Sequence, residues 1–288
     1  REEGGFLHAT APQLRGRTVV LRLPSVGATE NLILAACGAE GTTVLSNAAR
    51  EPEIEDLQNF LNACGGDVRG AGTSTVVIRG GRTFHGGTYR VMPDRIAAAT
   101  SLCALASAGG TGFLRGAREE HLDTVTAVLR EAGCHISAGP EGIACTCRER
   151  LRAVRPVRTA PYPGFPTDAQ AVLMAALLRD RGTTAFEENI FENRYRHVDE
   201  LARMGADIRV MGRVAVVTGV ETLHGAPVRC TDLRGGAALC VAALAAEGES
   251  CISETAHIAR GYEDIARDLG ALGADIRWGG ENNRSEQE

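Results

Sequence analysis

Two kinds of helix alternate along the chain, and they differ in how their apolar residues are distributed. Four segments, 28–39, 96–108, 169–178 and 235–246, are dominated by alanine, leucine, cysteine and glycine on every face. A helix that is apolar all round is surrounded by protein, and small side chains let neighbouring helices approach closely. These segments therefore predict interior helices with sheets outside them.

The helices of the second kind carry a single apolar stripe and end at a glycine. Residues 11, 8, 4 and 1 before that glycine share one helix face, because this spacing follows the 3.6-residue period. Three of the four stripes are apolar: Ile54, Leu57, Leu61 and Cys64; Leu122, Val125, Leu129 and Ala132; Tyr262, Ile265, Leu269 and Leu272. The remaining stripe is Arg194, His197, Leu201 and Met204. Its break in the pattern predicts a functional site, and the alternative is a helix end exposed to solvent.

Two series of glycines show that the chain is built from repeats. Gly41, Gly110, Gly182 and Gly248 are separated by 69, 72 and 66 residues, and Gly65, Gly133, Gly205 and Gly273 by 68, 72 and 68. Such a long period indicates a duplicated supersecondary unit, here of βαβαββ form. Short strands are expected after each glycine of the second series, at 67–69, 135–137, 207–210 and 275–278.

Composition narrows the class of protein. The 288 residues are 44% hydrophobic and 23% charged, which is ordinary for a globular protein, and the apolar runs are too short for a membrane span. A net charge of -5 gives no global attraction to nucleic acid or to an anionic membrane. Nine cysteines without metal-site spacing favour a reducing cytoplasm, and no metal or cofactor is predicted. All 31 basic residues are arginines, which excludes lysine Schiff-base chemistry within the chain.

The segment 159–170, T-A-P-Y-P-G-F-P-T-D-A-Q, is the strongest local candidate for a site. Its three prolines predict an extended run that ends in a helix beginning near Thr167. Asp168 then lies at a helix N-terminus, where an ionised carboxylate is favoured. It could serve as a general base or simply cap the helix. Related helix starts occur at Ser25, Asp94 and Asp232.

Seven ordered motifs together resemble the UDP-N-acetylglucosamine enolpyruvyl transferase family. They are P-S-V-G-A-T-E-N at 24–31, N-A-A-R-E-P-E-I at 47–54, P-D-R-I at 93–96, F-P-T-D-A-Q at 165–170, F-E-N-R at 191–194, T-D-L-R at 231–234 and A-R-G-Y-E at 259–263. The resemblance implies transfer of the enolpyruvyl group of phosphoenolpyruvate to the 3-hydroxyl of UDP-N-acetylglucosamine, in peptidoglycan precursor synthesis. It also implies two inside-out α/β barrels of βαβαββ repeats. Residues 1–92 would be part of the first domain, and 93–288 nearly all of the second.

The resemblance also assigns roles to residues. Asp168 matches the family's acceptor of the hydroxyl proton, and Asp232 matches a second acid of the cleft. The helix start at Ser25, Val26 and Gly27 would bind the diphosphate, because helix N-termini bind anions. The remaining substrate-binding positions are Glu51, Ile190, Arg194, Arg234 and Arg260, and the three arginines suit the carboxylate and phosphate of phosphoenolpyruvate.

Two hypotheses of different class follow. The first is an enolpyruvyl transferase represented by its C-terminal two thirds; the family's proton donor lies in the N-terminal third, so this chain is expected to be inactive by itself. The second is a non-catalytic relative that binds UDP-sugar or has a regulatory role. The retention of every charged motif position favours the first hypothesis.

Overall fold

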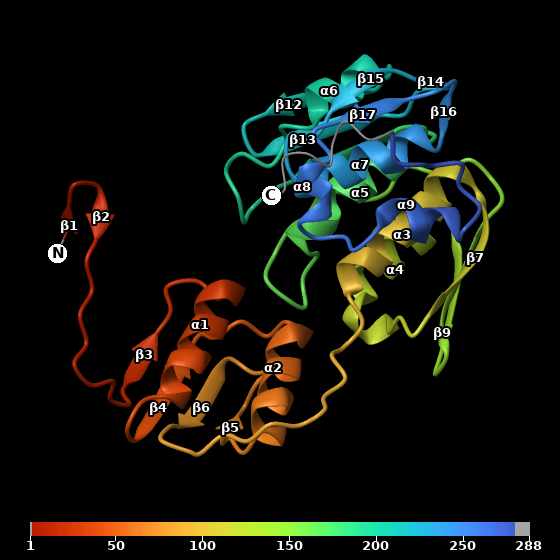
Figure 1. The fold of residues 1–288 in the computed structure, drawn as a ribbon. Helices are drawn as coiled ribbons and strands as arrows, with labels where there is room; N and C mark the ends of the chain where they lie inside the picture. Colours follow the sequence, from red (N-terminus) through yellow and green to blue (C-terminus); the bar gives the residue numbers. More distant parts are fainter. Residues whose placement is uncertain (1, 280–288) are drawn as a thin grey trace. The chain divides into compact units, whose positions relative to one another are not determined.

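A computed structural model of the chain describes residues 2–279, which form a mixed α/β fold (Figure 1). The chain divides into two compact units. Unit 1 comprises Arg1–Met92 with Pro161–Pro163, and unit 2 comprises Pro93–Ala160 with Gly164–Glu288. Each unit has its own hydrophobic core, so each is described by itself.

Unit 1 contains one complete repeat, preceded by a short hairpin of β1 (Glu2–Glu3) and β2 (Phe6–Leu7). The repeat runs β3 (Thr18–Val20), α1 (Val26–Cys37), β4 (Thr42–Ser46), α2 (Pro52–Ala63), β5 (Val68–Arg69) and β6 (Thr75–Arg79). The strands form one sheet in the order β3-β4-β6-β5, in which only β3 and β4 are parallel. Buried Ile33, Leu45, Ile54 and Ile78 join the helices to the sheet.

The middle of unit 2 repeats this plan. It runs β10 (Val157–Arg158), α5 (Thr167–Ala176), β11 (Thr183–Glu187), α6 (Val198–Arg203), β12 (Asp207–Met211) and β13 (Val214–Thr218). The sheet order is β10-β11-β13-β12, again with only the first pair parallel. The predicted βαβαββ repeat is therefore confirmed in both places.

The flanking parts of unit 2 follow the plan less completely. The first consists of α3 (Arg95–Ala108), β7 (Gly110–Arg115), the 3-10 turn η1 (Glu119–His121), α4 (Asp123–Ala132), β8 (His135–Gly139) and β9 (Gly142–Cys147). The last consists of β14 (Leu223–His224), β15 (Pro227–Arg229), α7 (Leu233–Ala243), β16 (Ala246–Glu247), β17 (Cys251–Ser253), α8 (Ala256–Ala259) and α9 (Ile265–Gly270). The strand predicted at 275–278 is wrong: this segment is irregular, and within residues 2–279 no neighbouring backbone pairs with it. A strand needs such a partner for its N–H and C=O groups.

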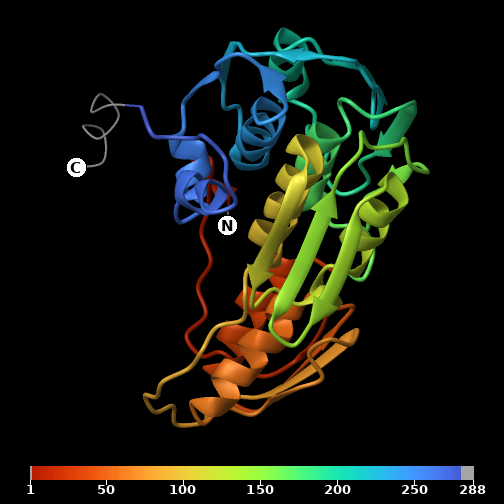
Figure 2. The same ribbon diagram turned by 90° about the vertical axis from the view of Figure 1, so that its right-hand side faces the viewer.

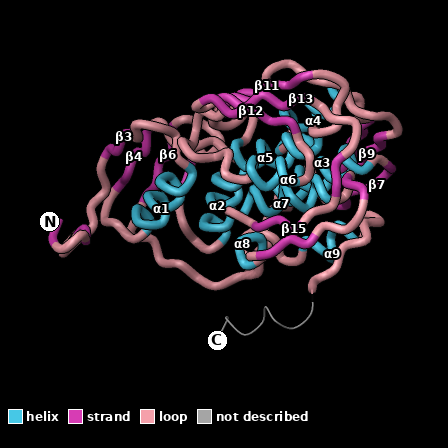
Figure 3. Tube along the Cα trace, turned by 90° about the horizontal axis from the view of Figure 1, so that it is seen from above, coloured by secondary structure: helices cyan, strands magenta, loops and turns pink. Residues whose placement is uncertain are grey.

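The small-residue helices of unit 2 are interior, as predicted, but the prediction is wrong for α1 of unit 1, where Leu34 is 50% exposed and Ala35 is also exposed. Helices α3, α5 and α7 pack against one another, and all residues of α5 from Ala169 to Ala176 are buried. Figures 2 and 3 show these helices side by side, with the sheets of unit 2 around them. Because α5 packs against both α3 and α7, residues at the N-terminal ends of these helices can contribute to one site.

The predicted apolar stripes are correct for two helices and partly wrong for the other two. In the last part of unit 2, α9 begins only at Ile265, so Tyr262 is buried but lies before the helix. Ile54, Leu129 and Ile265 are buried as expected. In the third repeat, α6 begins only at Val198, so Arg194 lies in the preceding loop and not on a helix face. His197 is the residue before the helix and is nevertheless buried. The segment that contains Arg194 remains a loop because its backbone and the Arg194 side chain bind to other groups, described below.

Two glycines occupy equivalent tight positions at the ends of the two complete repeats. Gly80 follows β6 and donates its N–H to the Gly41 carbonyl at 2.9 Å, and Gly219 follows β13 and donates to the Gly182 carbonyl at 2.9 Å. A Cβ at Gly80 would collide with the Ala39 carbonyl oxygen, and a Cβ at Gly219 with that of Asp180. The repeat therefore requires close backbone approach at this point.

Gly219→Ala should therefore destabilise the protein by about 1 to 3 kcal/mol, because the added methyl group meets backbone that cannot rotate away. Gly270→Ala is the matched control: it ends α9, its Cβ would meet nothing within 4 Å, and alanine favours a helix by up to about 1 kcal/mol. Urea unfolding of the three proteins measures both effects. Equal stability of Gly219→Ala and the parent would contradict the close approach.

Candidate functional site

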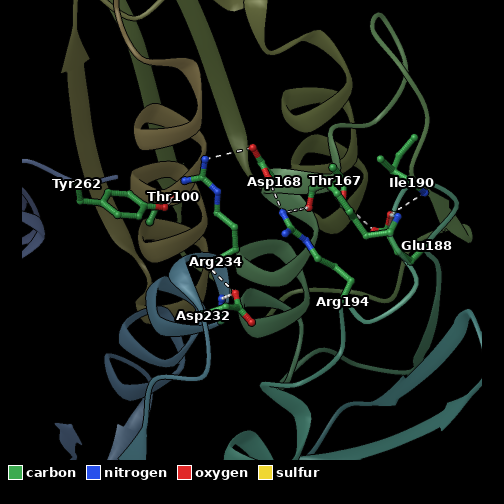
Figure 4. Close-up of polar contacts among 11 residues, drawn as sticks. Thr100, Thr167, Asp168, Glu188, Ile190, Arg194, Asp232, Arg234 and Tyr262 are labelled. Atoms are coloured by element: carbon green, nitrogen blue, oxygen red, sulfur yellow. Dashed lines mark hydrogen bonds and ion pairs between the residues drawn. The ribbon is translucent and has the colours of Figure 1, made fainter. Parts of the chain in front are cut away.

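The candidate site is a carboxylate held between two guanidinium groups. Asp168 accepts from Arg194 Nη2 at Oδ1 and from Arg234 Nη2 at Oδ2, the latter at 3.1 Å (Figure 4). Asp168 comes from the first turn of α5, Arg194 from the loop after β11, and Arg234 from the first turn of α7. Three elements that are distant in sequence thus meet at one ion-pair cluster.

Asp168 does not cap its helix, so the capping role that the sequence also allowed is wrong. The N-cap of α5 is Pro166, and no side chain caps this helix. The related starts do use their side chains: Asp94 accepts from Ile96 and Ala97 N–H at 2.7 and 3.0 Å. Asp232 likewise accepts from the Arg234 and Gly235 N–H groups at 3.0 and 2.9 Å. Both oxygens of Asp168 therefore remain available for side-chain partners.

The electrostatics of Asp168 follow from this position. Burial by itself would raise the pKa of Asp168, but the charges and hydrogen bonds of Arg234 and then Arg194 outweigh burial and hold that pKa below its usual value. The carboxylate is ionised at neutral pH, and the cluster carries one net positive charge. It therefore attracts anions.

Aromatic rings hold the two arginines in place. The Arg194 guanidinium lies 5.0 Å from the centroid of the Phe191 ring, and that of Arg234 lies 5.9 Å from the Tyr262 ring. Both distances suit cation–π contact. Tyr262 is itself fixed by a 2.7 Å hydrogen bond between its hydroxyl and that of Thr100 on α3. The guanidinium forks are thus positioned before any ligand arrives.

Glu188 is a positioning residue that the sequence analysis missed. It follows β11, is 1% exposed, and its Oε1 accepts the N–H groups of Ile190 and Phe191 at 2.8 and 3.0 Å. Its Oε2 accepts the Thr167 hydroxyl at 2.9 Å. One buried carboxylate therefore ties the loop that carries Arg194 to the helix start that carries Asp168. No motif or spacing in the sequence singles out this acid.

His197 lies behind the cluster and is 1% exposed. Neither ring nitrogen has a hydrogen-bond partner within the described residues, and the Nε of Arg194 is also buried without one. Burial lowers the pKa of His197 to about 4; the charge of Asp232 opposes burial, and the charge of Arg194 lowers the pKa further by a smaller amount. The histidine is therefore neutral at neutral pH.

The structure does not gather all the sequence-predicted residues. Ile190 is 39% exposed on the loop held by Glu188. Asp232 lies beside the cluster as the cap of α7. Arg260 is exposed at the end of α8, and no contact joins it to Asp168, Arg194 or Arg234 in the part of the chain that the structure describes.

The remaining predicted residues belong to unit 1. Ser25 caps α1 by accepting the Ala28 N–H at 3.3 Å, and the first turn, which includes Val26 and Gly27, contains no acidic residue. The first N–H groups of a helix lack partners within the helix, so this end suits an anion. Glu51 is 9% exposed and accepts the N–H of Arg50 at 3.0 Å and that of Tyr162 at 3.5 Å.

Residues 2–279 offer no group of three or more His, Cys, Asp or Glu side chains that could hold a metal ion. No helix in this range is long and apolar enough to cross a membrane. A cavity of about 690 Å³ lies elsewhere in unit 2, lined mainly by apolar residues such as Ile252, Ile258 and Trp278. It contains none of the predicted site residues.

Comparison with known proteins agrees with this geometry. The model of the EPSP synthase (3-phosphoshikimate 1-carboxyvinyltransferase) family matches residues 2–269. The chain is 48% identical over 275 residues to UDP-N-acetylglucosamine 1-carboxyvinyltransferase 2 of Caldanaerobacter subterraneus, covering 96% of this chain and 66% of that protein. It is also 48% identical over 273 residues to the UDP-N-acetylglucosamine 1-carboxyvinyltransferase of Myxococcus xanthus, covering 95% and 65%. The resemblance predicted from the seven motifs is thus confirmed, and the chain spans just under two thirds of the length of these relatives.

Two solved structures have a similar fold. The enolpyruvyl transferase NikO from Streptomyces tendae superposes with a TM-score of 0.82 at 29% identity, covering 93% of this chain and 66% of that one. An EPSP synthase from Acinetobacter baumannii superposes with a TM-score of 0.67 at 21% identity, covering 91% and 63%. The second likeness speaks for the fold alone.

The low pKa of His197 predicts a loss of stability in acid. Its folded pKa of about 4 lies below the unfolded value of about 6.5, so the folded state binds fewer protons. The stability that it contributes is complete above pH 6.5 and is lost as the pH falls towards 4, by about 3 kcal/mol at 1.4 kcal/mol per pKa unit.

The measurement is urea unfolding of the parent and of His197→Gln between pH 7 and 4. Buried Asp180 acts with the opposite sign, because burial raises its pKa to about 6 and its contribution is lost as the pH rises through 6. Taking the difference between parent and variant removes that contribution. The stability of the parent should fall more steeply; parallel curves would contradict the buried neutral histidine.

Proposed function

The chain belongs to the EPSP synthase family, and from that premise we propose that it takes part in transferring the enolpyruvyl group of phosphoenolpyruvate to the 3-hydroxyl of UDP-N-acetylglucosamine. The observation that carries the proposal is the Asp168 carboxylate between Arg194 and Arg234. It combines an acceptor for a hydroxyl proton with two donors for an anionic substrate. The names of the relatives support the choice of sugar nucleotide.

In the proposed reaction, the phosphate and carboxylate of phosphoenolpyruvate bind to the two guanidinium groups. Planar forks give paired hydrogen bonds to such oxygens, and the net positive charge of the cluster favours them. The sugar hydroxyl attacks the carbon that carries the phosphate, and its proton passes to Asp168. Once the methylene carbon has also been protonated, the resulting methyl group loses a proton to a base as the carbon–oxygen bond to the phosphate breaks. This restores the double bond of the enolpyruvyl group and releases inorganic phosphate.

The methylene carbon of phosphoenolpyruvate must also gain a proton before the product forms. Arginine does not release its proton in proteins, and Asp168 is ionised, so none of the three cluster residues is the donor. We place this donor outside the cluster.

The other predicted residues have supporting roles in the proposal. The start of α1 at Ser25, Val26 and Gly27 would bind the diphosphate of the sugar nucleotide through its N–H groups. Ile190 would contact the sugar nucleotide, Arg260 would add a third positive charge for phosphoenolpyruvate, and Asp232 would balance charge while capping α7. Glu51 would lie near the acceptor, where its contact to the Tyr162 backbone fixes the proline-rich segment.

The proposal extends to architecture and location. Unit 1 would be the incomplete first domain of an enolpyruvyl transferase, and unit 2 would be its second domain. Each would be an inside-out α/β barrel, with the helices inside and the sheets outside. Cytoplasmic peptidoglycan precursor synthesis suits the chemistry and the nine unpaired cysteines. Nucleic acids and membranes are not proposed partners.

The reaction is tested by measuring phosphate release with both substrates, from the chain alone and with the amino-terminal third of a relative added in trans. Asp168→Asn should lower turnover by about two to four orders of magnitude, the range for a positioned acid–base group. The fold should persist, because Asp168 does not cap α5. Near-normal turnover of this variant would contradict the assignment. Binding of both substrates without phosphate release would favour a non-catalytic relative that binds UDP-sugar.

Arg194→Leu should weaken phosphoenolpyruvate binding about tenfold or more, because one charged donor pair is lost. Stability should also fall, by about 1 to 3 kcal/mol, because Arg194 is mostly buried and its loss leaves Asp168 with one partner. Arg196→Leu is the matched control, an exposed arginine two residues away. Calorimetric titration and thermal unfolding separate the two effects. A large loss of stability with unchanged affinity would show that Arg194 is structural.

A further inference from the structure

The Asp168 carboxylate occupies one terminal nitrogen of each arginine, a donor that an anionic substrate would also use. Its two oxygens accept from the outer Nη2 groups of Arg194 and Arg234, one oxygen for each arginine. Both guanidinium groups are mostly buried, with side chains 17% and 15% exposed. An anion that approaches these Nη2 groups from solvent therefore competes with Asp168 for them.

The arginines have little freedom to serve both partners at once. Arg194 lies over the Phe191 ring and donates further to the Thr167 carbonyl at 3.4 Å. Arg234 lies over Tyr262, whose hydroxyl is bound by Thr100. Moving either guanidinium would break these contacts. Asp168, by contrast, has a short side chain that is 40% exposed and makes no cap hydrogen bond, so it is the partner able to give way.

We infer that Asp168 is an internal occupant of the anion site, and that the phosphate or carboxylate of a substrate must displace it from at least one arginine. This inference rests on the proposed function and concerns how its site is regulated. The negative carboxylate holds the two positive groups together until a substrate anion replaces it.

Displacement would also create the base. While both arginines bind Asp168, they hold the pKa of its carboxyl below the usual value, so it is a weak proton acceptor. Losing these bonds to an anion, and gaining that anion as a negative neighbour, both raise the pKa of a carboxyl group. The hydroxyl proton of the acceptor could then move to the freed Asp168 oxygen. Deprotonation would follow the arrival of the enolpyruvyl donor and would not precede it.

Calorimetric titration of the full chain with inorganic phosphate at pH 7 tests the competition. Asp168→Asn removes the internal anion and should bind phosphate about tenfold more tightly than the parent, a change of ~1.4 kcal/mol. Asp94→Asn is the matched control: Asp94 caps the neighbouring helix α3, asparagine also caps, and Asp94 does not contact either arginine. Its affinity should change by less than about threefold, as expected of a charge that acts only at a distance.

A crystal structure of the parent with phosphate decides between displacement and simple repulsion. We expect phosphate on Arg194 or Arg234, with the corresponding ion pair to Asp168 broken. Phosphate bound with both ion pairs intact would overturn the inference, as would an Asp168→Asn affinity equal to or weaker than that of the parent. Both results would leave the proposed anion site standing if Arg194→Leu still weakens binding. If neither the parent nor Asp168→Asn binds phosphate, the proposed anion site fails and this inference fails with it.

Discussion

One carboxylate shared by two guanidinium groups fixes the arrangement on which the rest of the site depends. Asp168, Arg194 and Arg234 come from three separate elements of unit 2, and their ion pairs join those elements at this point. The packing of α3, α5 and α7 makes the meeting possible, because small residues allow the helix axes to approach closely. The small side chains of these helices thus have a functional consequence: the N-terminal turns, with their positive dipole ends, lie close together.

Asp168 alone does not neutralise the two arginines. The three residues together carry one net positive charge in a partly buried setting, where a charge without a partner is costly. Nearby Asp232 and Glu188 offset part of this charge, but their oxygens bind the first N–H groups of α7, the loop backbone and Thr167 and not the guanidinium groups. The protein therefore keeps an arrangement that an external anion stabilises. Aromatic rings and Glu188 already hold these side chains in place. The side chains therefore lose little conformational freedom when an anion binds.

Local patterns revealed more of the fold than of the site. The glycine series and the apolar stripes identified the repeat, because close backbone approach and helix periodicity act over a few residues. Arg194 was wrongly placed on a helix, since its loop is held by Glu188 and Asp168, which are distant contacts without a sequence period. The segment 275–278 has strand character, but a strand also needs a neighbour. Motifs named Asp168 and both arginines, and only three-dimensional packing could show that they bind one another.

The ion pair between Asp168 and Arg234 arises because the structural unit is repeated with different residues at one equivalent helix position. Counted from the N-cap, Asp168 is the second residue of α5 and Arg234 the second residue of α7. In α1 the same position is Gly27, and in α3 it is Ile96. Equivalent positions on packed, repeated helices face a common point, so opposite charges placed there in consecutive repeats meet without any new backbone geometry. The cap position of α5 is a proline, which has no side-chain acceptor to satisfy the helix start, whereas α7 uses Asp232 for that purpose. The acid of α5 thus lies two residues beyond the cap and keeps both oxygens for chemistry.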